Sequence, residues 1–270
     1  MKFGVSNLAW AKEAEPRAIA LLRAKGFSGI EVAPTRIADW DALGDADLQA
    51  FRRRCDADGI VVSSLQAIYF NQPKAQLLGS AEDFKVMCDH TRRVGEIAAA
   101  LGATVAVFGA PRNRLKGDLS AADAEALGAE RFGLLGDIAG GHGLTLGIEP
   151  VPEYYGADFL TRVRDVAAMV ERCAHPNIRV HLDCACIMLG GDDPVQAIRD
   201  YARLTVHYHC AEPDLGPFSH PRCDHAGAGA ALRAVSYPGW VVIEMRQQGN
   251  DGLDALDEAL SVVAGVYRGS

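Results

Sequence analysis

Short apolar runs alternate with longer amphipathic stretches along the chain. Runs of four to seven residues rich in Val, Ile and Leu are typical of buried strands, and apolar residues spaced three or four apart are typical of helices. The predicted strands are Lys2–Ser6, Gly29–Ala33, Ile60–Gln66, Thr104–Gly109, Leu144–Glu149, Arg179–Asp183, Thr205–Cys210 and Val241–Glu244. The predicted helices include Glu15–Lys25, Ala46–Ala57, Phe84–Leu101, Ala121–Ala139, Phe159–Cys173, Val195–Tyr201 and Leu253–Val266.

This order of elements predicts an α/β fold. Strands that read as nearly continuous apolar runs, separated by helices, indicate a parallel sheet covered by helices. Eight such units close naturally into a barrel, so residues 1–270 are expected to form a single (β/α)8 TIM barrel domain. A doubly wound open sheet is the alternative, but no Gly-x-Gly-x-x-Gly follows the first strand.

The longest irregular stretches each follow a predicted strand rather than precede one. They are Ile68–Ser80, Pro111–Leu119, Pro150–Asp158 and Ala211–His225. In a barrel of parallel strands, loops of this kind all lie at the carboxyl end, where active sites are built. The functional end of the molecule is therefore expected there.

Composition excludes some classes of partner. A net charge of −8 argues against nucleic-acid binding, although a small anionic substrate needs only a few local arginines. No apolar stretch approaches the length of a membrane span, and the N-terminus does not read as a signal peptide. Seven cysteines without a framework spacing are typical of reduced thiols. A cytoplasmic location is therefore expected.

Four predicted strands end in a residue that can bind a metal ion: Glu149, Asp183, His209 and Glu244. One charged residue at a strand end usually caps a helix or pairs with an arginine, but four on successive strands converge on the barrel axis. A buried charge is costly without a partner, so this pattern favours one divalent metal site. Three carboxylates and one imidazole suit Mn²⁺, Mg²⁺ or Co²⁺ and tolerate Zn²⁺.

Motifs at most strand ends resemble those of the sugar phosphate isomerase/epimerase family. They are Ser6-Asn7-Leu8-Ala9-Trp10, Ile30-Glu31-Val32-Ala33-Pro34-Thr35, the segment from Val107 to Arg114, Ile148-Glu149-Pro150, His181-Leu182-Asp183, the segment from His207 to Pro213, and Val242-Ile243-Glu244-Met245-Arg246. The resemblance covers essentially the whole chain and implies a xylose isomerase-like TIM barrel. It places Glu149, Asp183, His209 and Glu244 on the four metal positions, and the two glutamates on the acid and base positions.

The same residues are suited to proton transfer next to a carbonyl group. A divalent ion acting as a Lewis acid stabilises an enediolate, and carboxylates on two sides of the substrate can remove and return a proton. Glu149 and Glu244 come from the fifth and eighth strands, so they can approach from different sides. The sequence therefore predicts an enzyme of carbohydrate metabolism: a metal-dependent isomerase or epimerase of a small sugar, sugar phosphate or related keto-polyol. Which glutamate is the acid stays open.

The chain departs from the pattern of the ketose 3-epimerases in this superfamily. Tyr155 replaces their glutamate six residues after the first metal glutamate, and Cys186 replaces their histidine after the metal aspartate. Pro213-Asp214-Leu215 stands where they carry an arginine. These departures argue against epimerisation of a free hexulose at carbon 3.

Other polar residues are candidates for substrate binding, each with a plainer alternative. Arg246 could bind a substrate carboxylate or phosphate, or hold Glu244 in place. Arg112 belongs to a charged cluster, Arg112-Asn113-Arg114 with Lys116, that could receive a phosphate or simply be solvated. Tyr155 and Gln66 are expected near the pocket.

Histidines outside the four metal positions also have two readings. Asp224 and His225 could contact the substrate, or Asp224 could cap a helix over Ala226–Val235. His181 and His207 each precede a metal position by two residues, so we expect them to support the metal site from the layer below.

Three other functions are alternatives to this prediction. A metal-dependent dehydratase of a keto-cyclitol or shikimate-type substrate would use the same site through an enolate, with His225 as the acid beside the leaving hydroxyl. A repair endonuclease is disfavoured by the charge of −8, and a non-catalytic scaffold by the presence of all four metal positions. Oligomers are frequent in the superfamily, so a homo-oligomer is expected to use Trp40 or Trp240 at an interface.

Overall fold

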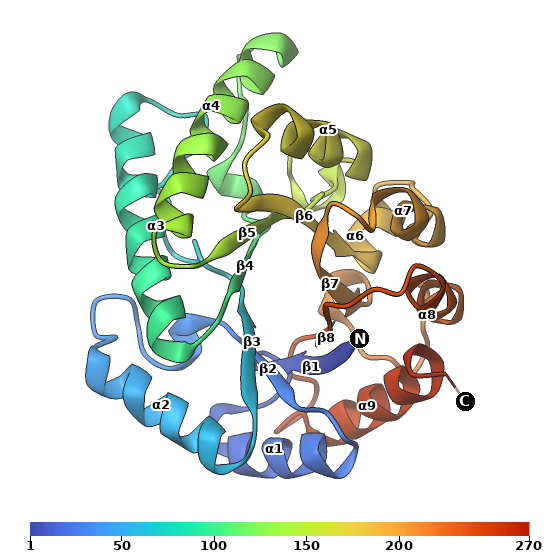
Figure 1. Cartoon of the computed structure of the whole chain (residues 1–270). Coiled ribbons are helices and arrows are strands. Elements are labelled where there is room, and N and C mark those ends of the chain that lie inside the picture. The colour runs from blue at the N-terminus through green and yellow to red at the C-terminus, as the bar shows by residue number, and fades with distance from the viewer. Residues whose placement is uncertain (270) are drawn as a thin grey trace.

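The computed structural model describes residues 1–269, in which eight parallel strands close into one barrel in chain order. In Figure 1 the strands form an inner ring and the helices surround it. The (β/α)8 barrel predicted from the sequence is therefore confirmed. The strands are β1 (Lys2–Ser6), β2 (Gly29–Val32), β3 (Val61–Leu65), β4 (Val105–Phe108), β5 (Thr145–Ile148), β6 (Ile178–Asp183), β7 (Thr205–Ala211) and β8 (Trp240–Glu244).

Helices connect each strand to the next. The α-helices are α1 (Glu15–Ala24), α2 (Asp45–Ala57), α3 (Ala81–Leu101), α4 (Ala121–Gly140), α5 (Val163–Cys173), α6 (Cys184–Leu189), α7 (Pro194–Tyr201), α8 (His225–Ala234) and α9 (Leu253–Tyr267). Short 3-10 helices are η1 (Lys12–Ala14), η2 (Pro34–Arg36), η3 (Pro111–Asn113), η4 (Glu153–Tyr155) and η5 (Pro213–Leu215). Each of these lies in a loop that follows a strand, so they shape the carboxyl end of the barrel.

Helices α5 and α6 differ most from the sequence prediction, and α3 begins at Ala81 rather than Phe84. Helix α5 begins at Val163 rather than Phe159, because Leu160 has a left-handed φ of 56° and Arg162 is extended. Helix α6 was not predicted. It starts directly after β6, where Asp183 caps it by accepting a 2.7 Å hydrogen bond from the Cys186 backbone. A six-residue helix is too short to give a clear periodic pattern.

The barrel closes between its first and last strands. Lys2 pairs with Trp240 and Phe3 with Val241 in a parallel register. The Trp240 indole lies against Gly29 at the start of β2, where an added Cβ would come within 2.4 Å of the ring. Only glycine leaves room for this packing, which fills the end of the barrel opposite the predicted site.

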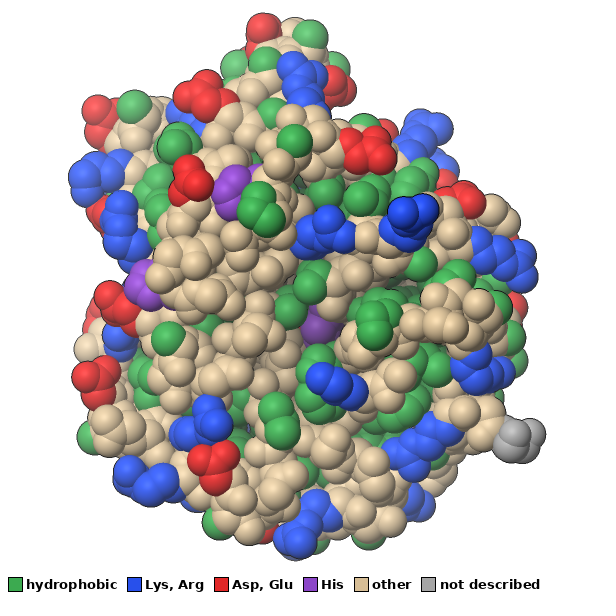
Figure 2. Space-filling view, in the orientation of Figure 1, with side chains coloured by type: hydrophobic (Ala, Val, Ile, Leu, Met, Phe, Trp, Pro, Cys, Tyr) green, Lys and Arg blue, Asp and Glu red, His purple; other side chains and the backbone are tan. Residues whose placement is uncertain are grey.

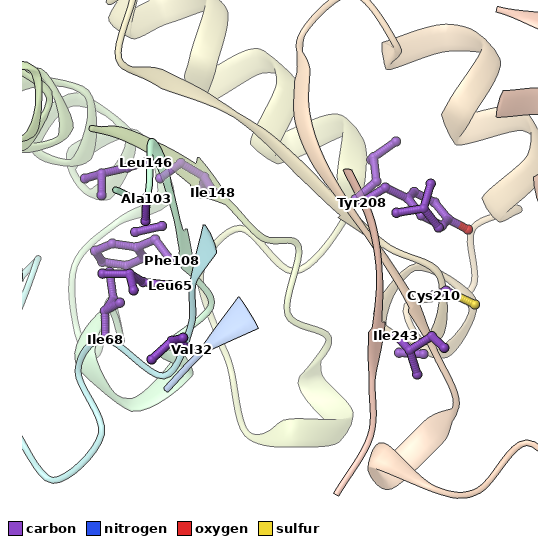
Figure 3. Close-up of a cluster of buried hydrophobic side chains, with 14 of the residues drawn as sticks. Val32, Leu65, Ile68, Ala103, Phe108, Leu146, Ile148, Tyr208, Cys210 and Ile243 are labelled. Carbon is purple, nitrogen blue, oxygen red and sulfur yellow. The ribbon is translucent and has the colours of Figure 1, made fainter. Parts of the chain in front are cut away.

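Strand residues alternate between the barrel interior and the surrounding helices, as the period of two requires. Figure 3 shows outward-facing side chains in two groups, one from β2 to β5 that includes Phe108 and Ile148, and one from β7 and β8 that includes Tyr208. These side chains are fully buried in the apolar core. The next residue on each strand therefore faces inward, and on β5 to β8 that position carries the polar groups.

The surface carries charges of both signs. Figure 2 shows Lys and Arg side chains, as well as Asp and Glu side chains, around the rim of one face. Among residues 1–269, no helix has the length and apolar character needed to cross a bilayer.

Candidate metal and substrate site

The four predicted metal-binding residues meet at the carboxyl end of the barrel. Asp183 pairs in register with His209 across β6 and β7, and Ala211 pairs with Glu244 across β7 and β8. His209 Nδ1 lies 3.2 Å from Glu244 Oε2 and 3.5 Å from Asp183 Oδ2. Glu149 follows β5 directly and lines the same cavity as Asp183 and Glu244. Parallel strands bring these ends together because all of them stop at one edge of the barrel.

Glu31, which ends close to His209 inside the barrel, fixes the orientation of the His209 ring. Its Nε2 lies 2.8 Å from Glu31 Oε1, a distance typical of a charge-assisted hydrogen bond. Its Nδ1 is buried and has no hydrogen-bond partner among residues 1–269. A histidine that binds a metal usually donates its other ring N–H to a carboxylate. Nδ1 is therefore the atom available to a metal ion.

Glu31 belongs to a buried network that the sequence did not reveal. Ser64 Oγ donates a 2.7 Å hydrogen bond to Glu31 Oε2 and lies 2.8 Å from His207 Nε2. Burial alone would raise the pKa of Glu31, but the neighbouring His209 and His207 lower it overall. Glu31 thus provides a negative charge beneath His209.

His181 lies beside the predicted metal-binding residues, close enough to be a further metal ligand. One of its ring nitrogens lies within 4.8 Å of donor atoms of Glu149, Asp183 and His209. Both ring nitrogens are buried without hydrogen-bond partners among the described residues. Burial, together with His209 and His207, lowers the pKa of His181 well below its usual range. His181 is therefore neutral and has a free lone pair facing the site.

The carboxylates repel one another in the absence of a cation. Burial raises the pKa of Glu149 well above its usual value, and the charges of Asp183 and Glu244 raise it further. Burial also raises the pKa of Glu244, although His209 partly offsets the effect. A divalent cation would remove this repulsion and would also give His209 Nδ1 a partner. The donor set fits such an ion.

Glu149 is held in place by two features of the loop after β4. An added Cβ at Gly109 would lie 2.2 Å from Glu149 Oε2, so glycine at this position leaves the carboxylate where it is. Arg114 is fully buried and donates a 2.7 Å hydrogen bond to the Glu149 backbone oxygen. Burial lowers the pKa of Arg114 to about 10, and the charge of Glu149 partly offsets this shift. Sequence reasoning treated Arg114 as one charge of a loop cluster, because nothing in the sequence signals its burial.

A first cavity of about 390 Å³ opens above the predicted metal positions. Two of the predicted substrate-binding residues, Tyr155 and Arg246, line it. The Tyr155 hydroxyl accepts a 2.8 Å hydrogen bond from the Asp214 backbone, and Arg246 donates a 2.6 Å hydrogen bond to the Asp214 carbonyl. These contacts fix η5 over the cavity. The full lining is Pro111, Glu149, Val151, Tyr155, Asp183, Ala185, Cys186, Ala211, Glu212, Asp214, Leu215, Glu244 and Arg246.

A second cavity of about 660 Å³ adjoins the first, and Glu149 and Glu244 line both. Gln66 and Arg112, the other predicted substrate-binding residues of this end, lie in its wall. Gln66 also donates a hydrogen bond to the Ser6 hydroxyl. The predicted residues Gln66, Arg112, Tyr155 and Arg246 are therefore divided between two connected spaces around the same pair of glutamates.

Asp224 and His225 lie elsewhere among the described residues. Asp224 caps α8 through a 2.8 Å hydrogen bond from the Gly227 backbone. His225 is buried, with Nε2 2.7 Å from Glu212 Oε1 and Nδ1 2.9 Å from the Tyr267 hydroxyl. Neither residue is part of the wall of the two cavities.

The closed parallel barrel, with a buried carboxylate and histidine group at its carboxyl end, defines a (β/α)8-barrel protein with a polar centre. The sequence pattern described as xylose isomerase-like TIM barrel matches residues 19–264. The chain belongs to this family. A comparison with the sequences of curated proteins finds no match.

Solved structures share the whole fold at low sequence identity. A D-psicose 3-epimerase determined in the presence of D-fructose has a TM-score of 0.80 and 21% identity, with 100% of both chains covered. The 3-keto-D-glucoside 4-epimerase of E. coli has a TM-score of 0.80 and 19% identity over 97% of this chain and 98% of that one. A probable 3-DHS dehydratase from Bacillus anthracis has a TM-score of 0.75 and 14% identity over 98% and 99%. At these identities the likeness establishes the fold.

Proposed function

We propose that this protein is a divalent-metal-dependent epimerase or isomerase of a small carbohydrate. One observation carries the proposal. The buried Glu149 and the half-buried Glu244 line the same cavity as Asp183, beside a His209 Nδ1 that has no hydrogen-bond partner among the described residues. Structural neighbours that are sugar epimerases support the choice of reaction.

The metal ion would be held by Glu149, Asp183, His209 and Glu244, with His181 close by. When bound, it would supply Lewis-acid polarisation of a substrate carbonyl and so acidify the adjacent C–H bond. Mn²⁺, Mg²⁺ or Co²⁺ matches the mixed oxygen and nitrogen donor set, and Zn²⁺ is also compatible with it.

The chain itself supplies the proton carriers. Carboxylates placed on two sides of a substrate can take a proton from it and return one. Glu149 extends from the end of β5 and Glu244 from the end of β8. One carboxylate would take the proton from the carbon next to the carbonyl, and the other would deliver a proton to the opposite face or to the neighbouring carbon. The first outcome is epimerisation and the second is isomerisation.

A dehydratase is the alternative, since one structural neighbour is a probable 3-DHS dehydratase. That reaction needs an acid beside the leaving hydroxyl group. His225, the candidate suggested by the sequence, lies between Glu212 and Tyr267 and outside the lining of either cavity. This placement favours proton transfer without loss of water.

The test combines metal content with solvent isotope exchange. Purified protein should carry about one divalent ion per chain by plasma mass spectrometry. The Asp183→Ala variant should lose the ion, while Asp254→Ala, which removes an exposed carboxylate of α9, should retain it. Ketoses and ketosides are then incubated with metal-loaded protein in D₂O and followed by NMR and mass spectrometry.

If a substrate carbon gains one deuterium and the substrate does not lose water, the result supports the epimerase or isomerase. Loss of water from the substrate would instead establish the dehydratase. Absence of bound metal, with none gained on incubation, would overturn both.

A further inference from the structure

The second cavity is larger than the first and opens onto the same two glutamates. Its volume is about 660 Å³, compared with about 390 Å³ for the first cavity, and Pro111, Glu149, Leu215 and Glu244 line both. Binding sites for compact ligands commonly measure roughly 300–1,000 Å³. The first cavity by itself falls in that range for a single sugar ring. A sugar that reacts at the carboxylates therefore leaves the larger space for a group attached to it.

The wall of the second cavity is fixed in place by side chains from other elements. Asn113 Nδ2 donates hydrogen bonds of 2.8 Å to the Gln72 carbonyl and 2.7 Å to the Ala75 carbonyl. Trp40 Nε1 donates a 2.7 Å hydrogen bond to the Phe70 carbonyl. His90 Nε2 lies 2.7 Å from the Ile68 carbonyl. A wall held in this way is preorganised, which reduces the entropy lost when a ligand binds.

The chemistry of this wall is that of a surface for neutral hydroxyl groups. Five amide side chains line it, namely Gln66, Asn71, Gln72, Gln76 and Asn113, and amides can both donate to and accept from hydroxyls. Phe70 also lines the cavity and is 57% exposed, although large apolar side chains are usually covered. An exposed aromatic ring beside several amides suits the apolar C–H face and polar edge of a sugar ring.

The charges argue against an anionic ligand. The first cavity is lined by five acidic side chains, Glu149, Asp183, Glu212, Asp214 and Glu244, and by one basic side chain, Arg246. The Arg246 guanidinium already donates to the Asp214 carbonyl. In the second cavity the basic residue is Arg112, which is exposed. A phosphate group in the first cavity would lie beside Asp214 and the carboxylates proposed to bind metal, with Arg246 as the basic side chain of that wall.

We infer that the substrate is a neutral glycoside, a keto sugar carrying a second sugar unit, rather than a sugar phosphate or a free monosaccharide. The inference rests on the proposed function, because it places the reacting sugar in the first cavity between Glu149 and Glu244. The second sugar lies in the second cavity, with its ring against Phe70 and its hydroxyls among the amides.

The test measures binding to metal-loaded protein and does not depend on turnover. The probes are three neutral disaccharides that contain fructose, namely isomaltulose, turanose and maltulose, compared with fructose and fructose 6-phosphate. At least one disaccharide should bind about tenfold more tightly than fructose, since each additional 1.4 kcal/mol of contact gives a factor of ten. Titration calorimetry and saturation-transfer NMR provide the affinities.

The Phe70→Ala variant separates the second sugar from the first. It should weaken disaccharide binding about tenfold through the lost aromatic contact and leave fructose binding unchanged. Phe70→Trp should retain the disaccharide affinity. Leu134→Ala, which removes an exposed apolar side chain from α4, is the matched control and should change neither affinity.

Several results would overturn the inference. These are equal affinity for disaccharides and fructose, no disaccharide binding, tightest binding of fructose 6-phosphate, or insensitivity of disaccharide binding to Phe70→Ala. The proposed function fails by different observations, namely absence of a metal ion and absence of C–H exchange with any ketose or ketoside. A protein that exchanges fructose protons but gains nothing from a second sugar keeps its proposed function and loses the glycoside site.

Discussion

Two buried groups of histidine and glutamate side chains lie on opposite faces of β7. On the outer face, both nitrogens of His225 have partners, Glu212 and Tyr267. On the inner face, His209 Nδ1 and both nitrogens of His181 have no hydrogen-bond partner among the described residues. The outer group is complete within the chain, whereas the inner group places ring nitrogens without hydrogen-bond partners next to carboxylates that repel one another. The comparison teaches that polar atoms without a partner, rather than buried charge as such, distinguish the site proposed to bind a metal ion.

The same comparison applies to the glutamates. Glu212 Oε1 contacts His225 and accepts a 3.3 Å hydrogen bond from the Cys223 backbone, and Oε2 accepts a 2.9 Å hydrogen bond from the Arg222 backbone. Both oxygens are thus satisfied. For Glu149, by contrast, burial and the neighbouring Asp183 and Glu244 raise the pKa well above its usual value. Binding a proton or a cation would therefore stabilise the Glu149 carboxylate.

The largest expected effect comes from removing a proton carrier of the inner group. In Glu149→Gln or Glu244→Gln, the amide keeps an oxygen near the metal position but cannot exchange a proton. We expect the rate of substrate C–H exchange to fall by about 10²–10⁴ at saturating metal. Glu153→Gln, an exposed residue of η4, is the control and should retain the full rate. Full exchange activity in both site variants would contradict the assignment of the two glutamates.

The outer group is broken by His225→Phe, which keeps a ring in place against Phe218 but removes both polar contacts. Leaving Glu212 without its buried partner should reduce the free energy of unfolding by about 3 kcal/mol, measured by urea denaturation. Metal content and substrate KM should not change. The exposed His220→Phe is the control in the same loop. An increase in KM without loss of stability would instead support the sequence-based role of His225 in substrate binding.

Glu31 connects His209 of the inner group to Ser64 and His207, which lie deeper in the barrel. In Glu31→Gln, the side chain can still accept a hydrogen bond from His209 Nε2, but its negative charge is lost. Because outer partners raise the basicity of a ligating histidine, metal affinity should fall about 10–100-fold. Metal titration of the apoprotein measures this directly, without reliance on activity. The exposed Glu82→Gln should bind metal normally. Unchanged affinity in Glu31→Gln would show that Glu31 has only a packing role.

The smallest expected effect concerns His90, which is half-buried and hydrogen-bonded through one nitrogen to the Ile68 carbonyl. Burial lowers the pKa of His90 below its usual value, partly offset by this hydrogen bond. The unfolded chain therefore binds more protons than the folded chain between the folded pKa and about 6.5, so stability falls as the pH drops through that window. In His90→Phe, the decrease in Tm on acidification should be smaller than in the unmodified protein by about 2 °C. An unchanged pH dependence of Tm would contradict this assignment.

Much of the fold was predictable because its signals are local. Strand and helix positions follow from hydrophobic periodicity, and the eight alternating units specify the barrel. The convergence of Asp183, His209 and Glu244 follows from the same pattern, since the carboxyl ends of parallel strands must meet. Helix α6 was not predicted because six residues are too few to show a periodic pattern. The start of α5 was placed too early because the hydrophobic pattern does not report the backbone dihedrals that delay the helix.

Side-chain environments were less predictable. Arg114 reads as one charge in a solvated loop cluster, yet it is fully buried and bound to the Glu149 backbone. His225 reads as an active-site residue because it follows a long loop, yet it lies against Glu212 and Tyr267. In each case the partner is distant in sequence. Tyr267, for example, comes from the last helix, and no local pattern specifies that contact.

The sequence by itself determined the barrel, its functional end and the four residues proposed to bind metal, because these depend on periodicity and on which residue follows each strand. The tertiary structure alone decided which nitrogen of His209 is free, that Glu31 supports it and that two cavities share Glu149 and Glu244. Those features depend on distances between side chains from different strands and loops. Such distances are set only when the whole barrel closes and packs.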